Sequence, residues 1–290
     1  MEKSAAAGGM DASDVRVLHR VDLTEGPTGS GDVANTRVGV AVDVETTGKV
    51  LETGAIIELA LRRFRFDADG VITHVDRSYC WREDPCFPIP EEIVSLTGIT
   101  DGDVAGERID DEVALRLLRS ASIVVAHNAA FDRPWIERRL DGVADLDWAC
   151  SMSQVDWRAR GFDGLGLGYL LCQAGWFHDA HRGASDVDAL IQLLRHEFDD
   201  GRTALSLLLE RAARPSWILR AHGAAFEVKD VLRGRGYRWD AGRRVWWTEV
   251  ADEGRTAEEF WLAANVYAAG KDARSMGPAF EEVSAATRFR

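Results

Sequence analysis

The stretch VGVAVDVE at residues 38–45 decides the fold of this chain. It is nearly continuous in apolar residues until its two acids, a pattern typical of a central strand covered on both faces. Successive side chains of a strand point to opposite faces, so Asp43 and Glu45 project to the same side. Two such carboxylates repel each other and lose hydration, which a hard cation between them would offset. Taken alone, the pattern is weak evidence for a metal site, and two acids at a solvated strand end explain it better.

The surrounding sequence predicts an α/β layer architecture with a mixed sheet. Strands are expected over residues 55–66, 72–81 and 122–126. Helices are expected from Pro90 to Gly98, over residues 110–120, after Asn128, and over residues 164–174 and 185–198. The last of these has its apolar residues at helical spacing.

Two further acidic residues fall in the first turns of predicted helices. Asp132 ends the stretch HNAAFD at residues 127–132, where Asn128 could cap the helix and Asp132 could simply complement the helix dipole. Asp186 ends the stretch HRGASD at residues 181–186. His181, which opens that stretch, is either an ordinary surface histidine or a group that exchanges a proton near neutral pH.

In their order and spacing, these elements resemble the DEDDh (DnaQ-like) exonucleases, the family of the proofreading subunit of bacterial DNA polymerase III. DVETTG at residues 43–48 is similar to the first family motif, in the form that favours the proofreading branch. HNAAFD is similar to the second motif, and His181 followed by Asp186 has the spacing of the third. LTGIT at residues 96–100 is similar to an element between the first two, and the resemblance covers about residues 37–198. One departure is Gly183, where relatives commonly have alanine, and we expect it to loosen the loop that carries His181.

The resemblance implies a ribonuclease H-like mixed sheet flanked by helices. It also implies a metal-dependent 3′–5′ exonuclease that releases nucleoside 5′-monophosphates from single-stranded or frayed DNA ends. By the same analogy, His181 would act as general base, and two Mg²⁺ or Mn²⁺ ions would be held by Asp43, Glu45, Asp132 and Asp186. The residues expected near the substrate are Thr46, Thr47, Ile99, Asn128 and Phe131. Ordinary core packing explains Ile99 and Phe131 equally well.

The C-terminal part of the chain has a different composition. Residues 211–247 hold nine basic and three acidic residues, although the net charge of the whole chain is −13. The segment reads as a short helix and two strands, and it looks like a small accessory module found in some bacterial and phage exonucleases and helicases. Its arginines and aromatic rings could contact nucleic acid, or the tryptophans could form a small core. The candidates for nucleic-acid contact are Arg235, Arg238, Trp239, Arg243 and Arg244.

These features predict five segments along the chain. They are a disordered lead-in over residues 1–36, the exonuclease domain over 37–200, a linker over 201–215, a small basic α+β module over 216–268, and a flexible tail over 269–290. The four cysteines lack zinc-site spacing, and the N-terminus lacks an apolar core, so we expect reduced thiols in a cytoplasmic protein. No stretch approaches the roughly 20 apolar residues of a membrane span.

Three rival functions remain open at this point, of which a mainly structural interaction protein is supported only by the expected disordered ends. An exoribonuclease of the same fold would differ in contacts to the 2′-OH, which the sequence does not locate. An inactive module that binds nucleic acid or recruits a polymerase would be expected to have lost some of the acids or the histidine, and all five are present. The expected partner is nucleic acid, with DNA favoured and RNA possible. A polymerase or repair protein is a further possible partner, and no interaction with a membrane is expected.

Overall fold

The computed structural model describes residues 15–268 and 277–290. Its main feature is a six-stranded sheet with the order β2-β5-β4-β3-β6-β7. The strands are β2 (Gly26–Pro27), β3 (Arg37–Thr46), β4 (Ile56–Phe66), β5 (Ile72–Arg82), β6 (Ile123–Ala126) and β7 (Trp148–Cys150). Strands β2 to β5 pair antiparallel, whereas β6 and β7 continue the sheet in parallel from β3. The mixed sheet predicted from the sequence is confirmed.

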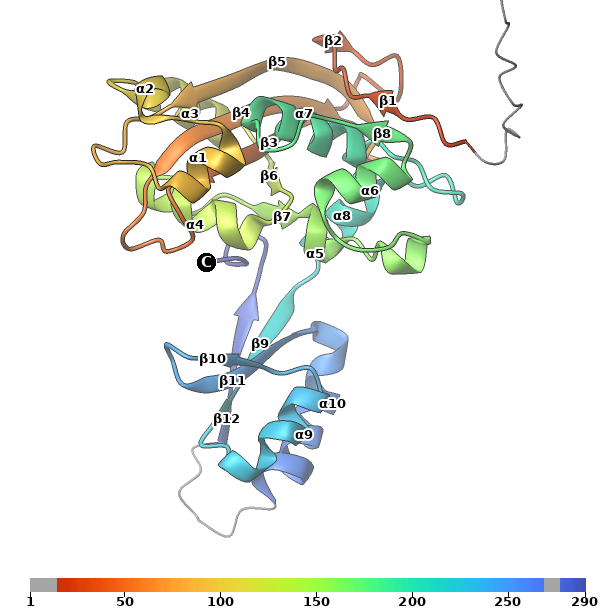
Figure 1. Cartoon of the computed structure of the whole chain (residues 1–290). Coiled ribbons are helices and arrows are strands. Elements are labelled where there is room, and N and C mark those ends of the chain that lie inside the picture. Colours follow the sequence, from red (N-terminus) through yellow and green to blue (C-terminus); the bar gives the residue numbers. More distant parts are fainter. Residues whose placement is uncertain (1–14, 269–276) are drawn as a thin grey trace, which may run out of the picture.

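Helices cover both faces of this sheet (Figure 1). They are α1 (Glu91–Thr97), α2 (Asp101–Val104), α3 (Asp111–Arg119), α4 (Ala129–Arg139), α5 (Ser151–Gln154), α6 (Leu167–Gln173), α7 (Gly183–Leu194) and α8 (Ala204–Ala213). One hydrophobic cluster joins the sheet to α6, α7 and α8, and another joins the opposite face to α3 and α4. Within the described ranges, no helix has the length and apolar character needed to cross a membrane.

Strand β3 is buried from both sides, and this burial positions the acids at its end. Val40, Val42 and Val44 belong to the cluster shared with α3 and α4, while Ala41 belongs to the cluster shared with α7. Asp43 and Glu45 continue the alternation of Ala41, so both face α7. The two carboxylates therefore occupy the positions that follow the apolar side chains of this face, where β3 leaves the hydrophobic core.

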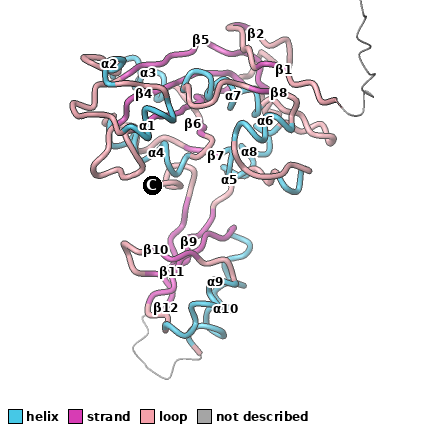
Figure 2. The backbone as a smooth tube through the Cα atoms, in the orientation of Figure 1, coloured by secondary structure: helices cyan, strands magenta, loops and turns pink. Residues whose placement is uncertain are grey.

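A smaller four-stranded antiparallel sheet follows, with the order β10-β11-β9-β12. Its elements are β9 (Ser216–His222), α9 (Lys229–Gly234), β10 (Arg238–Asp240), β11 (Val245–Ala251), α10 (Arg255–Leu262) and β12 (Gly277–Val283). Helices α9 and α10 cover one face of this sheet around a core that includes Leu219, Leu232 and Leu262. Figures 1 and 2 show β9 leading away from the larger domain and β12 returning to it.

Three segments differ from the sequence-based expectations. The proposed linker, residues 201–215, contains α8, whose apolar side chains join the core of the larger domain. Part of the proposed disordered lead-in is ordered, because β1 (His19–Arg20) pairs with β8 (Trp176–Phe177) and β2 pairs with β5. Part of the proposed flexible tail is β12, paired with β9 along seven residues. Residues 1–14 and 269–276, where the remainder of these two expectations falls, lie outside the described residues.

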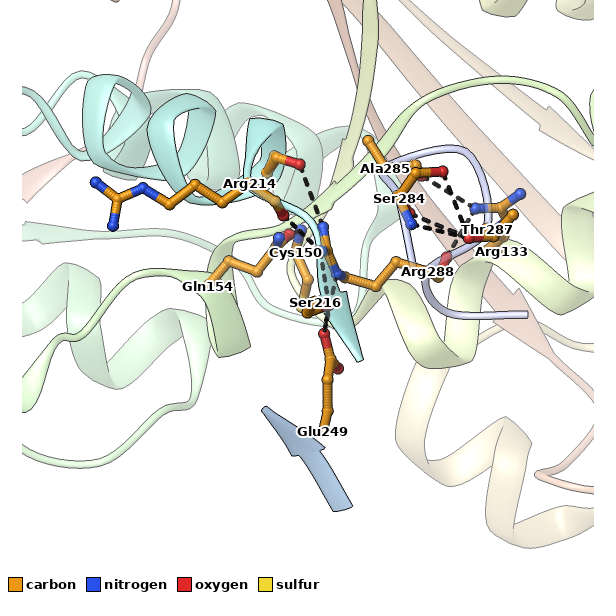
Figure 3. A network of polar contacts seen from close by, with 11 residues as sticks. Arg133, Cys150, Gln154, Arg214, Ser216, Glu249, Ser284, Ala285, Thr287 and Arg288 are labelled. Atoms are coloured by element: carbon orange, nitrogen blue, oxygen red, sulfur yellow. Dashed lines mark hydrogen bonds and ion pairs between the residues drawn. The ribbon is translucent and has the colours of Figure 1, made fainter. Parts of the chain in front are cut away.

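The last residues, 284–290, dock against the larger domain beside α4 (Figure 3). Arg133 of α4 is fully buried, and its guanidinium donates hydrogen bonds to the carbonyl oxygens of Ala286 and Arg288, both at 2.7 Å. Arg288 is also buried and lies 3.2 Å from Glu249 of β11 and 3.0 Å from the hydroxyl of Ser216 in β9. The chain end thus ties the helix that carries Asp132 to the smaller sheet.

Candidate active site

Three carboxylates meet where β3 leaves the core. One oxygen each from Asp43, Glu45 and Asp186 lies within 4.8 Å of the others. The approach is close because α7 begins at Gly183, whose N–H donates a hydrogen bond to Glu58 at 2.9 Å. Gly183 is buried against Ala60, so its lack of a side chain lets α7 begin close to β4, while its effect on the histidine loop stays a prediction.

Asp132 approaches the same place from the opposite face of the sheet. It lies in the first turn of α4, it is 4% exposed, and its Oδ1 accepts a hydrogen bond from the N–H of Val44 at 3.3 Å. Val44 stands between Asp43 and Glu45 in β3, so this bond fixes Asp132 to the strand that carries the other two acids. The structure therefore brings together all four predicted acids.

Burial and mutual repulsion make ionisation of these acids unfavourable. Burial first, then the charges of Asp132 and Asp186, raise the pKa of Asp43 well above its usual value. Burial, followed by the charge of Asp186, raises the pKa of Glu45 to about 7. Burial likewise raises the pKa of Asp132 to about 7, although the Val44 N–H opposes the shift. Such a set of carboxylate oxygens suits a divalent cation, whose charge would offset the repulsion.

A fifth carboxylate, Glu58, borders this group and was not anticipated from the sequence. It stands directly opposite Glu45 in the β3–β4 pairing and is 6% exposed. One oxygen accepts the Gly183 N–H, and the other lies 3.6 Å from Arg82. Glu58 therefore holds the start of α7 against β4. Its sequence context, an acid within the apolar strand 56–61, is the only signal that could have indicated it.

The two histidines before α7 are placed differently from what the sequence suggests. His181 is exposed and has a φ of 60°, in the left-handed region. The imidazole that contacts the acids belongs to His178, whose Nε2 lies 2.9 Å from Oδ1 of Asp186 and whose side chain is 3% exposed. The other oxygen of Asp186 accepts the N–H of Arg182 at 2.8 Å. The spacing of the third family motif selects His181, whereas the contact of His178 with Asp186 depends on the path of the loop before α7.

The residues predicted to contact substrate differ in burial: most of them are buried or partly buried, and Asn128 is exposed. Thr46 and Thr47 are buried at the end of β3, where the Thr46 hydroxyl donates to the Gly48 carbonyl and the Thr47 hydroxyl accepts from the Ala55 N–H. Ile99 is 1% exposed in a small core cluster. Phe131 packs against Trp135, with a centroid distance of 6.0 Å. Asn128 is exposed at the N-cap position of α4, and its side chain makes no capping hydrogen bond, so the capping role is not observed.

The residues of the smaller domain that were predicted to contact nucleic acid have different surroundings. Arg235 pairs with the buried Glu258 at 2.9 Å and stacks on Trp261. Arg238 stacks on Trp247, whereas its neighbour Trp239 lies against Trp246. Arg243 and Arg244 are exposed in the turn between β10 and β11.

Comparison with known proteins agrees with this geometry. A family model described as Exonuclease (RNase_T) matches residues 40–194, more than half of the chain. A PolC-type DNA polymerase III of Clostridium perfringens is 39% identical over 103 residues, which are 35% of this chain and 7% of that protein. Ribonuclease T of Shewanella frigidimarina is 30% identical over 116 residues, which are 35% of this chain and 52% of that protein. The chain thus spans about half or less of the curated relatives it matches.

The solved structures extend the likeness to most of the chain. Exonuclease I of E. coli, in complex with an oligonucleotide, superposes with a TM-score of 0.51 and 15% identity. The match covers 87% of this chain and 64% of that one, and at this identity it concerns the fold alone. Since the family model spans the strands and helices that carry all four acids, this chain belongs to the RNase_T exonuclease family.

Proposed function

We propose that this chain is a divalent-metal-dependent 3′–5′ exonuclease that removes nucleoside 5′-monophosphates from single-stranded or frayed DNA ends. The observation that carries the proposal is the convergence of Asp43, Glu45 and Asp186 within 4.8 Å, with Asp132 bonded to the backbone between the first two. Buried acids at this density are unfavourable without a cation. Their arrangement on an exonuclease-family fold supports a phosphodiester hydrolase.

In this proposal, Asp43, Glu45, Asp132 and Asp186 hold two Mg²⁺ or Mn²⁺ ions. When bound, such ions stabilise phosphoryl charge and make a bound water more acidic. The role of the chain is to keep the four acids at fixed positions on β3, α4 and α7. Glu58 maintains the position of α7 by accepting the Gly183 N–H, and the Val44 N–H maintains that of Asp132 by donating to its carboxylate.

His181 is proposed to accept the proton of the attacking water. Two observations support this role: His181 stands in an exposed stretch just before α7, and it is five residues from Asp186. Thr46, Thr47, Asn128 and Phe131 are proposed to contact the terminal nucleotide, because they flank the acids at the end of β3 and the start of α4. The buried Ile99 would act by shaping the wall behind them.

The proposal is tested with a 5′-labelled single strand and Mg²⁺. The wild type should produce a ladder that EDTA abolishes. Asp43→Ala should lower the rate by about 100-fold or more, since loss of a residue that only hydrogen-bonds to a metal ligand already lowers activity or metal affinity by about 10- to 100-fold. His181→Ala should lose about 100-fold or more, which is the range for one positioned base. His74→Ala, which changes a histidine of β5, is the matched control and should retain full activity.

Each component of the proposal can fail separately. A ladder that survives EDTA or Asp43→Ala contradicts the metal-dependent mechanism. Loss of activity in His178→Ala but not in His181→Ala would transfer the base role to His178, which already contacts Asp186. No cleavage of any strand under any divalent metal would favour the inactive binding module.

An exoribonuclease is the second candidate, because ribonuclease T is among the relatives. The two candidates share the same acids and differ in the sugar they accept. End-labelled single-stranded DNA, duplex DNA and RNA should be compared under identical conditions. A higher kcat/KM on single-stranded DNA supports the first candidate, and a higher value on RNA supports the second.

A further inference from the structure

A cavity of about 400 Å³ lies between the two domains. Asn128 and Met152 line it from the larger domain. Arg211 of α8, Arg238 and Trp247 of the smaller sheet, and Phe289 near the chain end line the other sides. Residues 284–290, which dock beside α4, close one side of the cavity through Arg288 and Phe289.

The smaller sheet presents its open face to this cavity. Arg238 and Trp247 are paired across β10 and β11, and the guanidinium lies 5.5 Å from the centre of the indole ring. Their neighbours Trp239 and Trp246 point to the opposite face, where Trp246 joins the core under the helices. The stacked arginine and tryptophan are thus directed at the larger domain, and Trp247 is only partly buried.

The charges lining the cavity favour an anionic occupant. Three arginines line it against one carboxylate, Glu249, which already pairs with Arg288. Within residues 15–268 and 277–290, neither Arg211 nor Arg238 has a carboxylate at ion-pair distance. The nearby charge of Arg211 also contributes to lowering the pKa of Arg288, after the larger effect of burial. Two guanidinium groups without a paired carboxylate in these ranges, in a chain of net charge −13, would attract a phosphate to this cavity.

One residue that lines the cavity, Asn128, belongs to the segment that carries Asp132. This residue precedes α4, and Asp132 follows it by one helical turn. Since the Asn128 side chain does not cap the helix, its amide is free to bond a ligand in the cavity.

We propose that the cavity binds the nucleotides that precede the one being removed from a single strand. One base stacks on Trp247, and the neighbouring phosphates contact Arg238 and Arg211. This inference rests on the proposed exonuclease function and locates the path of its substrate. Aromatic stacking accepts any base, and arginine contacts to phosphate carry no sequence information, so the site suits an enzyme that must move along a strand.

Substrates of increasing length test the inference. The p-nitrophenyl ester of thymidine 5′-monophosphate occupies the catalytic site alone, whereas single strands from dinucleotide to dodecamer extend from it. Trp247→Ala should leave kcat/KM on the ester unchanged and raise KM on the longer strands by about 5- to 100-fold, the range for loss of one stacked base. Trp247→Phe, which keeps a ring, should retain most of the affinity.

The contribution of Arg238 and Arg211 can be measured from how the affinity for a single strand depends on salt concentration. Binding of a fluorescent dodecamer to protein carrying Asp43→Asn reports affinity without cleavage. Arg238→Ala and Arg211→Ala should each lower the slope of log K against log salt by about 0.7, the value for one phosphate contact on a single strand. Arg233→Ala removes the same charge from α9, on the other face of the sheet, and Phe260→Ala removes an aromatic ring that is 70% exposed. Both controls should match the wild type in affinity and slope.

The outcomes separate this inference from the function on which it rests. If the wild type hydrolyses neither the ester nor any strand, the proposed function fails. If the wild type degrades strands but Trp247→Ala and Arg238→Ala behave as Arg233→Ala does at every length, the cavity is not the substrate path. A defect of the same size on the ester as on the dodecamer would also overturn the inference, because it would place these residues in the catalytic step.

Discussion

Gly183 is the residue at which α7 comes closest to the sheet. A Cβ at this position would lie 2.9 Å from the Cβ of Ala60 and 3.0 Å from an oxygen of Glu58, so the start of α7 would have to move outward. Gly183→Ala should therefore destabilise the protein by about 1–3 kcal/mol. It should also weaken Mn²⁺ binding, since Asp186 would move away from Asp43.

Urea unfolding and Mn²⁺ titration measure these two effects. Gly234→Ala is the matched control, because Gly234 ends α9 with no atom within 4 Å of its added Cβ. That control should leave Mn²⁺ affinity unchanged. Wild-type stability and metal affinity in Gly183→Ala would show that α7 does not depend on this close approach.

The raised pKa values of Glu45 and Asp132 predict how stability depends on pH without metal. Both rise to about 7 in the folded protein, from usual values of 4.5 and 3.8, so the folded state binds protons more tightly than the unfolded chain. This contribution to stability is complete below the usual pKa values and is lost as the pH rises through about 7. In EDTA the melting temperature should thus be higher near pH 6 than near pH 8, and saturating Mg²⁺ should restore it at the higher pH.

Variants identify the source of that pH dependence. Asp43→Asn removes the central charge of the group and should flatten the fall in melting temperature. Asp230→Asn changes a carboxylate that is 72% exposed in the smaller domain and should leave the fall as in the wild type. An equal fall in both variants would show that the pH dependence arises elsewhere.

Strands and helices could be predicted best where burial gives the apolar residues of an element a regular local spacing. The continuous apolar run of β3 and the helical spacing of Val187, Leu190 and Ile191 in α7 both report burial directly, and both elements are found where expected. Helix α8 was readable in the same way, because Leu205, Leu208 and Ala212 face the core. The change in composition that follows this segment favours a domain boundary instead, and this is why the sequence-based prediction of a linker over residues 201–215 is wrong.

Elements that depend on distant partners could not be predicted. Strand β12 contains Pro278, which lacks an N–H and is tolerated there because β12 is an edge strand. Its existence follows from pairing with β9, about 60 residues earlier, and no local pattern records that. The same limit applies to the site: the four acids could be predicted from the resemblance of their motifs to the DEDDh exonucleases, whereas the contact of His178 with Asp186 depends on the path of the loop between them.

At the scale of the whole molecule, the two domains are joined by more than a linker. The chain leaves the larger domain through β9, returns through β12, and ends against α4, so that Arg133 and Arg288 bond across the junction (Figure 3). Deleting the smaller domain would therefore damage the larger one. The buried Arg133 would lose the acceptors in residues 284–290 while staying next to Asp132 in α4.

A double-variant cycle should expose this coupling. Removing residues 284–290 should destabilise the larger domain by about 3–5 kcal/mol, because it leaves a fully buried guanidinium with fewer partners. Arg133→Met in the full chain should cost about 1–3 kcal/mol, since it leaves the carbonyls of Ala286 and Arg288 unpaired. The combined variant contains neither the buried charge nor the unpaired carbonyls, so it should be more stable than the sum of the two losses implies.

Urea unfolding of the four proteins measures the coupling. Arg290→Ala is a control, because the Arg290 side chain is 41% exposed and its removal leaves the Arg133 acceptors in place. Additive losses, within about 0.5 kcal/mol, would mean that the chain end and α4 are held independently.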